Sequence, residues 1–456
     1  MKRKVSGHKL NVIMRKLSLS VVCIFLLVNT KAQQVLTLEE AIAAALKSNY
    51  DILMSRNDSA SFALDYSYAW AAFLPRLNAS ANTTWNRNNQ NVTFMKRDGT
   101  GGDSSVTRDA VKSNNLNYAV NLNWTLFDGF KMFATRDKLA EFQVLGELGV
   151  KNQVVNTVAT VITTYYNIVR QKQQLRAIEE QMSINEERVQ LADRRLSVGL
   201  GSKPELLQAK VDLNAQAAAR LQQLALIAQV RDQLNQLIGF RTGSVYEVTD
   251  SIPLNTSLQF GELVQKIEDT NPTLLIARKN IDIAQITLRE RKAELFPALT
   301  FNSTYNFNQN DNSTVVNLFQ PFFTQNKGFN YGFGLSVPIF NGFNTRRLIR
   351  QAQLDIRYQQ LFYDNQRSLI DVSISNAYKD YELQKQLLQL EEENINLAKE
   401  NVAIALERFR QGVSTNLELR EAQISLEAAY NRLIAARYNT KLAETELLRL
   451  KGDLVK

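Results

Sequence analysis

Residues 115–130 read NLNYAVNLNWTLFDGF, and from Asn115 to Leu126 apolar side chains alternate with small or amide side chains. Strict alternation predicts a β-strand with one apolar face and one polar face. The polar face is largely asparagine, whereas the solvent face of an ordinary sheet usually carries Lys and Glu. We expect the strand to stop at Asp128-Gly129, a turn signal, because the residues that follow have helical periodicity.

An internal repeat organises the chain. Three pairs of segments match: residues 118–130 with 331–343, residues 195–213 with 408–426, and residues 73–86 with 295–308. The first two pairs are 213 positions apart, and the third pair is 222 positions apart. The first repeat therefore carries a longer insert between its strands, and we expect its Gly-rich part, residues 97–103 (RDGTGGD), to form a loop.

Both repeats predict the same order of elements. A helix ends before a proline, two strands joined by a polar loop follow, and an Asp/Asn-Gly-Phe turn leads into a very long helix with a glycine tip and a return helix. We expect a first repeat at 33–240, a linker at 241–258 and a second repeat at 259–456. The strands are expected at about 77–86, 115–127, 299–308 and 330–340, and the tips at 199–202 and 412–415.

Residues 1–32 are typical of a secretory signal peptide. A basic segment precedes the apolar run 17–28, and Thr30-Lys31-Ala32 resembles a cleavage site. The apolar run is too short for a permanent membrane helix, which needs about 20 residues. Val22 precedes Cys23 and is not a small residue, so we expect no lipoprotein site there.

Cleavage of this segment limits the chemistry that the chain can perform. The segment holds seven basic and no acidic residues, so the formal net charge falls from +9 to +2, with 47 basic against 45 acidic residues. So small a charge does not indicate nucleic-acid binding. His8 and Cys23 are the only His and Cys of the chain, and their loss excludes Ser-His-Asp and Cys-His catalysis, disulfides and His/Cys metal sites. We expect no catalytic residue, cofactor or bound metal.

Two stretches are far longer than the helices of a compact domain. Residues 131–198 and 343–411 contain no proline, and their apolar residues recur at helical spacing. Each stretch predicts a helical rod of roughly 100 Å. Such rods can bury their apolar stripes only by packing on each other and on rods from other chains. The expected fold is therefore mainly α, with a small β part.

All four expected strands alternate in the same sense, and each is about as long as a tilted membrane strand, roughly ten residues. An apolar face in lipid and an amide face in water fit this pattern better than a soluble sandwich, for which no second β layer is available. A lipid-exposed sheet must close, and four strands cannot close a barrel, so we expect eight strands from a dimer or twelve from a trimer. Aromatic residues expected at the lipid interface are Trp85, Tyr118, Trp124 and Tyr305.

These features together resemble the TolC-type outer-membrane efflux channel family, over essentially all of the mature chain. The resemblance rests on the duplicated units, Pro75 and Pro297 before the strands, the Asp/Asn-Gly turns, and the Gly-centred tips followed by E-L-x-x-A. It implies a homotrimer with a twelve-stranded barrel in the outer membrane and a periplasmic helical tunnel. It also implies a periplasmic adaptor (membrane fusion protein), an inner-membrane pump of RND or ABC type, and outer-membrane lipid as partners, with no nucleic acid.

The resemblance also assigns candidate pore residues at the periplasmic mouth. Family members carry acidic residues at the positions of Glu421, Glu418 and Glu205, and a trimer would turn each into a ring of carboxylates that favours cations. Glu205 and Glu418 are also the third residues of expected capping boxes, so they could simply satisfy helix N-termini. Glu421 has no capping role and is the better pore candidate.

The resemblance further implies a gate and a docking surface at the tips. Some family members hold the mouth shut with a Tyr and an Arg at the positions of Phe409 and Ser414, so this chain lacks both the hydroxyl and the cation of that lock. The tip residues that match the adaptor-docking positions are Arg195, Val198, Gly199, Leu200, Arg408, Gln411, Gly412 and Val413.

The function that follows is a passive outer-membrane exit duct of a tripartite efflux or type I secretion system. The chief alternative is a non-channel, membrane-anchored coiled-coil scaffolding protein with a plugged barrel. A secreted hydrolase that uses carboxylates alone is the weakest alternative, because no paired-carboxylate signature stands out from the helix surface charge.

Overall fold

A computed structural model describes residues 35–95, 103–255, 257–315 and 320–454. The expected signal peptide therefore lies outside the described residues, as does most of the expected Gly-rich loop. The chain divides into two compact units. Among the described residues, unit 1 takes those within 35–55, 150–272 and 368–454, and unit 2 takes those within 56–149 and 273–367. Each unit takes segments from both sequence repeats, so the repeats do not correspond to separate compact units.

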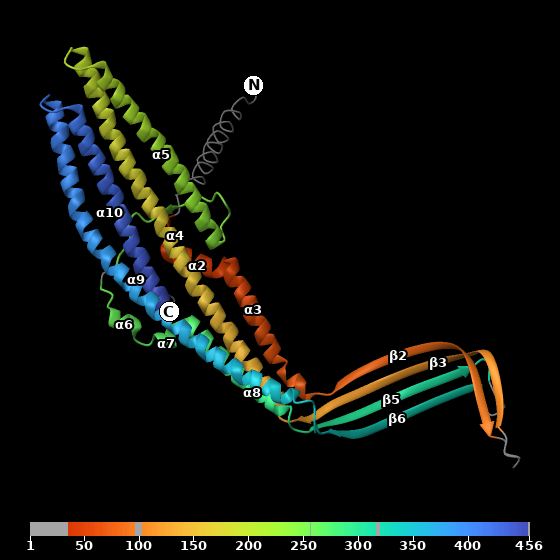
Figure 1. The fold of residues 1–456 in the computed structure, drawn as a ribbon. Coiled ribbons are helices and arrows are strands. Elements are labelled where there is room, and N and C mark those ends of the chain that lie inside the picture. The colour runs from red at the N-terminus through yellow and green to blue at the C-terminus, as the bar shows by residue number, and fades with distance from the viewer. Residues whose placement is uncertain (1–34, 96–102, 256, 316–319, 455–456) are drawn as a thin grey trace, which may run out of the picture. The chain divides into compact units, whose positions relative to one another are not determined.

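The helices account for most of the described residues (Figure 1). They are α2 (Leu38–Ser48), α3 (Tyr50–Ser67), the 3-10 helix η1 (Ala69–Phe73), α4 (Lys131–Ser197), α5 (Lys203–Ile238), α6 (Phe260–Val264), α7 (Ile267–Thr270), α8 (Pro272–Ala293), α9 (Asn344–Arg410) and α10 (Asn416–Lys451). The strands are β1 (Val35–Leu36), β2 (Arg76–Met95), β3 (Asp103–Asp128), β4 (Glu247–Val248), β5 (Ala298–Asn312) and β6 (Phe323–Ser336). Among the described residues, no helix offers a stretch both long and apolar enough to cross a membrane.

Unit 2 contains a four-stranded antiparallel sheet in the order β2-β3-β5-β6 (Figure 1). Its register continues the sequence alternation across the strands. On the apolar face, Ala81 pairs with Tyr118 and Tyr118 pairs with Phe307. On the amide face, Asn123 pairs with Asn302, and its side-chain nitrogen donates to the Asn302 side-chain oxygen at 2.8 Å. The four strands therefore share one apolar face and one amide face.

The strands differ in length from the expected ones. β2 and β3 continue well beyond the alternating segments, to Met95 and from Asp103, so they take up much of the insert that was expected to be loop. Alternation did not reveal this part, because residues 87–91 (RNNQN) are polar on both faces. The ladder is irregular between Asn88 and Gln90. β6 begins earlier than expected and ends at Ser336, before Pro338, which cannot donate a ladder hydrogen bond.

The turn after β3 has an unusual backbone. Gly129 and Phe130 both have left-handed conformations, with φ of 71° and 70°. A Cβ on Gly129 would lie 2.3 Å from the Ala293 carbonyl oxygen, so only glycine fits here. The Asp128 carboxylate accepts from the Met132 backbone N–H at 3.1 Å and caps the start of α4. The second repeat turns in the same way at Gly342 and Phe343, with φ of 64° and 61°.

The two helical hairpins, α4–α5 and α9–α10, have matching lengths. The long helices both have 67 residues and the return helices both have 36. Every boundary in the second hairpin lies 213 positions after its counterpart in the first, as Lys131 and Asn344 illustrate. The prediction of two long rods, each followed by a return helix, is therefore confirmed.

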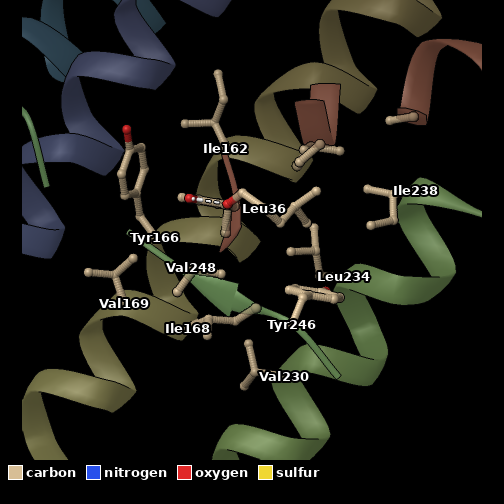
Figure 2. Packing of buried hydrophobic residues seen from close by; sticks show 14 of the residues in the cluster. Leu36, Ile162, Tyr166, Ile168, Val169, Val230, Leu234, Ile238, Tyr246 and Val248 are labelled. Atoms are coloured by element: carbon tan, nitrogen blue, oxygen red, sulfur yellow. Dashed lines mark hydrogen bonds between the residues drawn. The ribbon is translucent and has the colours of Figure 1, made fainter. Parts of the chain in front are cut away.

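A hydrophobic core in unit 1 joins α2, α4 and α5 to the short strand pair β1–β4 (Figure 2). Leu234, Ile238 and Val158 are fully buried in it. The Tyr165 hydroxyl donates to the Leu36 carbonyl oxygen at 2.8 Å and pins β1 against α4. Burial raises the pKa of Tyr246, another member of this core, to about 12. This core ties the N-terminal strand to the first hairpin.

Candidate functional site

Both hairpins end in the same glycine-centred turn. In the first, the Leu200 N–H donates to the Arg195 carbonyl at 2.8 Å, and the Gly199 N–H donates to the Leu196 carbonyl at 3.1 Å. In the second, the Val413 N–H donates in the same way to the Arg408 carbonyl at 3.0 Å. Together with the positive φ of the glycines, 76° and 74°, these bonds define Schellman motifs. The sharp tips expected from sequence are present.

Most of the expected docking residues are exposed in unit 1. Val198, Leu200 and Val413 have 67%, 75% and 66% of their surface exposed. Leu417, which the docking prediction did not include, is 68% exposed on the first turn of α10. Other expected docking residues that are also exposed are Gly199, Arg408, Gln411 and Gly412. Exposed aliphatic side chains thus gather on both tips.

Glu205 and Glu418 differ in the contacts that their carboxylates make at the helix N-termini. The Ser202 hydroxyl accepts from the Glu205 N–H, and the Glu205 carboxylate accepts in return from the Ser202 N–H at 3.3 Å, which completes a capping box. Thr415 accepts from the Glu418 N–H at 3.3 Å, but the Glu418 carboxylate lies instead 3.8 Å from the Arg408 guanidinium. The capping alternative therefore accounts for Glu205 better than for Glu418.

Glu421 lies one turn beyond Glu418 on α10 and is exposed. Within the described ranges, its carboxylate has no hydrogen bond or ion pair. The Ala422 side chain next to it is buried against the hairpin, so Glu421 lies on the outward side of α10. Unlike Glu205, Glu421 therefore has no capping role at its helix N-terminus.

The two residues at the gate positions are buried. Phe409 is 2% exposed, and the guanidinium of Arg195 lies over its ring at 5.1 Å from the ring centre. Ser414 is 8% exposed, and its hydroxyl has no hydrogen-bond partner in the described part of the chain. Phe409 therefore packs between the two hairpins within one chain. Arg195, an expected docking residue, is half-buried because it covers this ring.

Further ion pairs join the hairpins near the tips. Arg410 on α9 pairs with Glu187 on α4 and lies 3.1 Å from Glu407. Hydrogen bonds from Gln411 and then Arg410 hold the pKa of Glu407 below its ordinary range. Sequence reasoning missed these contacts, because a Glu or Arg on a long helix looks like ordinary surface charge.

One buried arginine was also missed. Arg188 on α4 is 0% exposed and pairs with Asp212 on α5, while its Nη1 donates to the Gln423 side-chain oxygen on α10 at 2.8 Å. Its only sequence signal is that the matching position of the second repeat holds Asn401. The first hairpin is thereby fastened to the second by a buried cation.

The four expected lipid-interface aromatics all lie in the sheet of unit 2 and are exposed in the single chain. Their exposed fractions range from 37% for Trp124 to 75% for Trp85. Tyr118 lies against Phe307 with ring centres 5.9 Å apart, and Tyr305 is in the neighbouring pair of the same face. The Trp124 indole N–H donates to the Phe73 carbonyl at 2.8 Å, so this ring is also fixed to the end of η1.

Comparison with known proteins gives a consistent result. The family model described as "Outer membrane efflux protein" matches residues 41–240 and 263–453. The chain is 22% identical over 423 residues to the outer membrane efflux protein BepC of Brucella suis, covering 92% of this chain and 86% of BepC. It is 23% identical over 444 residues to the alkaline protease secretion protein AprF of Pseudomonas aeruginosa, covering 91% and 86%.

Solved structures share the fold. The outer membrane protein VceC of Vibrio cholerae matches with a TM-score of 0.70 at 17% identity, over 91% of this chain and 96% of VceC. The CmeC outer membrane channel of Campylobacter jejuni matches with a TM-score of 0.71 at 17% identity, over 91% and 85%. The resemblance seen in the repeats and tips is confirmed: the chain belongs to the outer membrane efflux protein family, whose members are outer-membrane channels with a periplasmic helical part and not enzymes.

Proposed function

We propose that three copies of this chain form a passive exit duct in the outer membrane. The observation that carries the proposal is the single apolar face shared by β2, β3, β5 and β6, opposite a face of amides and small residues. An apolar face suits lipid, and an amide face suits a water-filled bore. The duct performs no chemistry, and it selects its cargo by size and charge.

The two edges of the sheet require more than one copy of the chain. β2 and β6 are the outer strands of the four-stranded sheet. Unpaired strand edges are not tolerated in lipid, so β6 of one copy pairs with β2 of the next. Three copies supply twelve strands, the number that the family resemblance implies.

The paired tips supply the docking surface for a periplasmic adaptor. Val198 and Leu200 on one hairpin and Val413 on the other present exposed aliphatic side chains on rigid turns. Such a surface suits a partner with an apolar groove or helix face. The adaptor connects the duct to an inner-membrane pump of RND or ABC type. One relative is named for alkaline protease secretion and another for a toluene efflux pump, so both a secretion system and an efflux system have support among the relatives.

Glu421 is proposed to form an acidic ring at the periplasmic mouth. Three exposed carboxylates around a narrow opening favour cations over anions. Glu418 lies on the same side of α10, three residues earlier, and adds a second ring that is partly neutralised by Arg408 at 3.8 Å.

The duct is tested by single-channel conductance of the purified mature oligomer in planar bilayers. We expect a stable conductance whose cation selectivity falls in Glu421→Gln. The matched control is Glu427→Gln, the next carboxylate along α10, which accepts a hydrogen bond from Gln216 at 3.3 Å and should leave the selectivity unchanged. If the oligomer conducts but its cation selectivity is unchanged in Glu421→Gln, Glu421 does not line the pore, and the proposed duct still stands.

A closed mouth is tested with the double variant Glu418→Ala and Glu421→Ala, which removes both proposed rings. If this folded, membrane-inserted oligomer also conducts no ions, the duct is wrong and the scaffolding alternative replaces it. Docking is tested separately by Val413→Asp, which should abolish adaptor-dependent export in cells while the conductance of the purified oligomer stays unchanged.

A further inference from the structure

Three arginines lie at the start of α9, shortly after β6. Arg346, Arg347 and Arg350 are exposed in its first two turns and line one open hollow of about 580 Å³. Arg347 donates to the side-chain oxygens of Asn344, at 3.0 Å, and of Gln351, at 3.4 Å. Among the described residues, Arg346 and Arg350 have no hydrogen bond or ion pair. The pore and docking residues lie elsewhere, so this basic cluster is a separate feature of the fold.

The carboxylate beside the basic cluster is already paired. Glu294 and Arg346 both line a second, smaller hollow of about 180 Å³. Glu294 lies 3.1 Å from Lys131 and 3.0 Å from Arg291, so it already faces two other cations. Arg346 and Arg350 are also one turn apart on the same side of α9, and like charges at that spacing repel and destabilise a helix. In the part of the chain that the structure describes, no carboxylate pairs with either arginine.

The duplicated scaffold does not require these arginines. The matching positions at the start of α4, 213 residues earlier, hold Phe133, Ala134 and Asp137. Asp137 lies 3.0 Å from Arg289 of α8, so the first repeat has an ion pair where the second has an unpaired cation. Both long helices nevertheless have 67 residues. Because only the second repeat carries the basic cluster, its role is not to form the helix.

The first repeat indicates on which side of the sheet the basic cluster lies. Arg346 corresponds to Phe133, whose ring centre is 6.0 Å from that of Phe130. Phe130 in turn meets Phe127 edge to face, and Phe127 pairs with Leu299 on the apolar face of the sheet. The start of α4 therefore continues the apolar side of the sheet. The matching start of α9, which carries the arginines, is on that same side.

Exposed apolar side chains lie between β6 and the basic cluster. Ile339 and Phe340 are 94% and 73% exposed, and Phe343 is exposed as well. The rings of Phe340 and Phe343 meet edge to face with centres 5.3 Å apart, as Phe127 and Phe130 do at 5.1 Å. Ile339, Phe340 and Phe343, the apolar strip, thus extend the apolar face as far as the arginines. An apolar surface that ends in cations matches the boundary between lipid tails and headgroups.

The next copy of the proposed oligomer leaves the basic cluster accessible. α9 follows β6 and α3 precedes β2, so α9 meets α3 of the next copy as α4 meets α8 within one chain. Beside α8, Phe133 stays 42% exposed and the Asp137 side chain stays 33% exposed. The residue of α3 that corresponds to Arg289, 222 positions earlier, is Ser67. The next copy therefore brings no carboxylate to Arg350 at that position.

We propose that Arg346 and Arg350 bind the phosphate diester of a phospholipid in the periplasmic leaflet of the outer membrane. This inference rests on the proposed duct, which places the apolar face in lipid. The guanidinium groups bind the phosphate oxygens through charge-assisted hydrogen bonds, for which arginine is especially suited. The apolar strip contacts the adjoining ends of the acyl chains. Because α9 belongs to the periplasmic helical part, the bound lipid fixes the depth at which the sheet sits in the membrane.

The test counts the lipids bound to the delipidated mature oligomer by native mass spectrometry. The probes are phosphatidylglycerol and monogalactosyldiacylglycerol with the same acyl chains, which has a sugar in place of the phosphate. We expect one tightly bound phosphatidylglycerol per chain and no comparable binding of the glycolipid. The double variant Arg346→Gln and Arg350→Gln should raise the apparent dissociation constant for phosphatidylglycerol about tenfold, because it removes both charge-assisted contacts.

Arg357→Gln is the matched control. Arg357 is exposed on the same helix, seven residues or about 10 Å beyond Arg350, and it lies outside the lining of both hollows. This variant loses one positive charge but should keep the wild-type affinity. The same spectra report the mass of the oligomer and so show whether each variant assembles. If the double variant does not assemble, Arg346→Gln and Arg350→Gln are measured singly, and each should weaken binding about threefold.

The proposal is overturned if the glycolipid binds as tightly as phosphatidylglycerol, or if the arginine variants bind phosphatidylglycerol as well as Arg357→Gln does. Inorganic phosphate and glycerophosphate, which lack acyl chains, should not displace the lipid. Displacement by either at millimolar concentration would assign the basic cluster to a free anion and overturn the lipid proposal. An oligomer that conducts but binds no phosphatidylglycerol loses only this site, whereas failure of the duct itself is recognised by the absence of conductance.

Discussion

The guanidinium of Arg195 lies 5.1 Å from the ring centre of Phe409, so a residue of the first hairpin covers a buried residue of the second. The contact joins the two tips of one chain directly, four residues before Gly199 and three before Gly412. A cation over an aromatic face is worth about 0.5–2 kcal/mol, depending on how far water is excluded. Phe409, an expected gate position, therefore contacts the first hairpin within one chain.

Arg195→Met should loosen the tips while it keeps an apolar side chain over the ring. Losing the cation should cost about 1 kcal/mol, so the amides near Phe409 should exchange hydrogen about fivefold faster. Hydrogen–deuterium exchange of residues 404–414 measures this. Arg194→Met is the control, because Arg194 is exposed and its side chain has no partner among the described residues. Equal exchange in both variants would show that the Arg195–Phe409 contact contributes nothing.

Gly129→Ala should lower the free energy of unfolding much more than Gly342→Ala does. Both glycines have positive φ, which costs an L-residue about 1–2 kcal/mol. Only at Gly129 would the new Cβ also meet a backbone oxygen, at 2.3 Å, whereas Gly342 has open space. We expect Gly342→Ala to lower the free energy of unfolding by about 1 kcal/mol and Gly129→Ala by clearly more, about 3 kcal/mol or above. Urea unfolding compares them, and equal losses would exclude the steric clash.

Leu122→Arg should block assembly in the outer membrane, and Asn121→Arg should not. The two residues are neighbours in β3, and register places Leu122 opposite Leu77 on the apolar face and Asn121 opposite Asn78 on the amide face. An arginine on the lipid side costs about 2–4 kcal/mol near the bilayer centre. The measurement is the amount of heat-resistant oligomer in the outer-membrane fraction. Similar amounts for both variants would contradict the assignment of the faces.

Asp250 should make part of the stability of unit 1 depend on pH, with the stability falling at acidic pH. Hydrogen bonds from Arg176, at 2.7 Å, and then from Lys172, at 3.2 Å, hold its pKa below the ordinary 3.8. A lowered pKa in the folded state stabilises above the unfolded value, and that stabilisation is lost as the pH falls through the folded value. Because Asp250 is largely exposed, each pair contributes about 0.5 kcal/mol or less.

Asp250→Asn should therefore lower the thermal midpoint at pH 7, and its curve should meet that of the wild type once the pH has fallen below the lowered pKa of Asp250 in the folded state. High salt should shrink the difference at pH 7, since exposed pairs are screened. Asp193→Asn is the control, because Asp193 is exposed and forms no ion pair in the described ranges. A difference that persists unchanged into acid would mean that Asp250 stabilises by something other than its charge.

Much of the fold could be predicted from sequence because its signals are local and repeated. Alternation located the apolar faces of the strands, and the glycines and helix caps located both tips. The prediction stopped where the local signal stopped: residues 87–91 are strand, but they are polar on both faces and so lack the apolar face that would have marked them. β6 was placed too far toward Pro338 because apolar residues continue beyond its last ladder pair.

The candidate site was predictable only in part. The glycines of the repeat predicted the two turns, and the family resemblance named the docking residues on them, of which Val198, Leu200 and Val413 are exposed. The burial of Phe409 and Arg188 depends on contact between hairpins that are about 200 residues apart in sequence, and neither residue has a local pattern that reveals it. The family resemblance named Phe409 only as a gate position, which gave no indication of its contact with Arg195.

The equal helix lengths of the two hairpins limit where this chain can gain or lose residues. Removing one residue between positions 150 and 187 would turn every later side chain of α4 by about 100° and shift it by about 1.5 Å along the helix. Arg188 and Arg195 would then miss their partners on α10 and α9, since the second hairpin would be unchanged. The loops between the strands carry no such constraint, and the two repeats differ in length there. Residues 73–86 and 295–308, before these loops, are 222 positions apart, whereas the matching helices are 213 positions apart. Length variation among related chains should therefore accumulate in the strand hairpins, and paired insertions in both repeats should be the only changes in length that the helices accept.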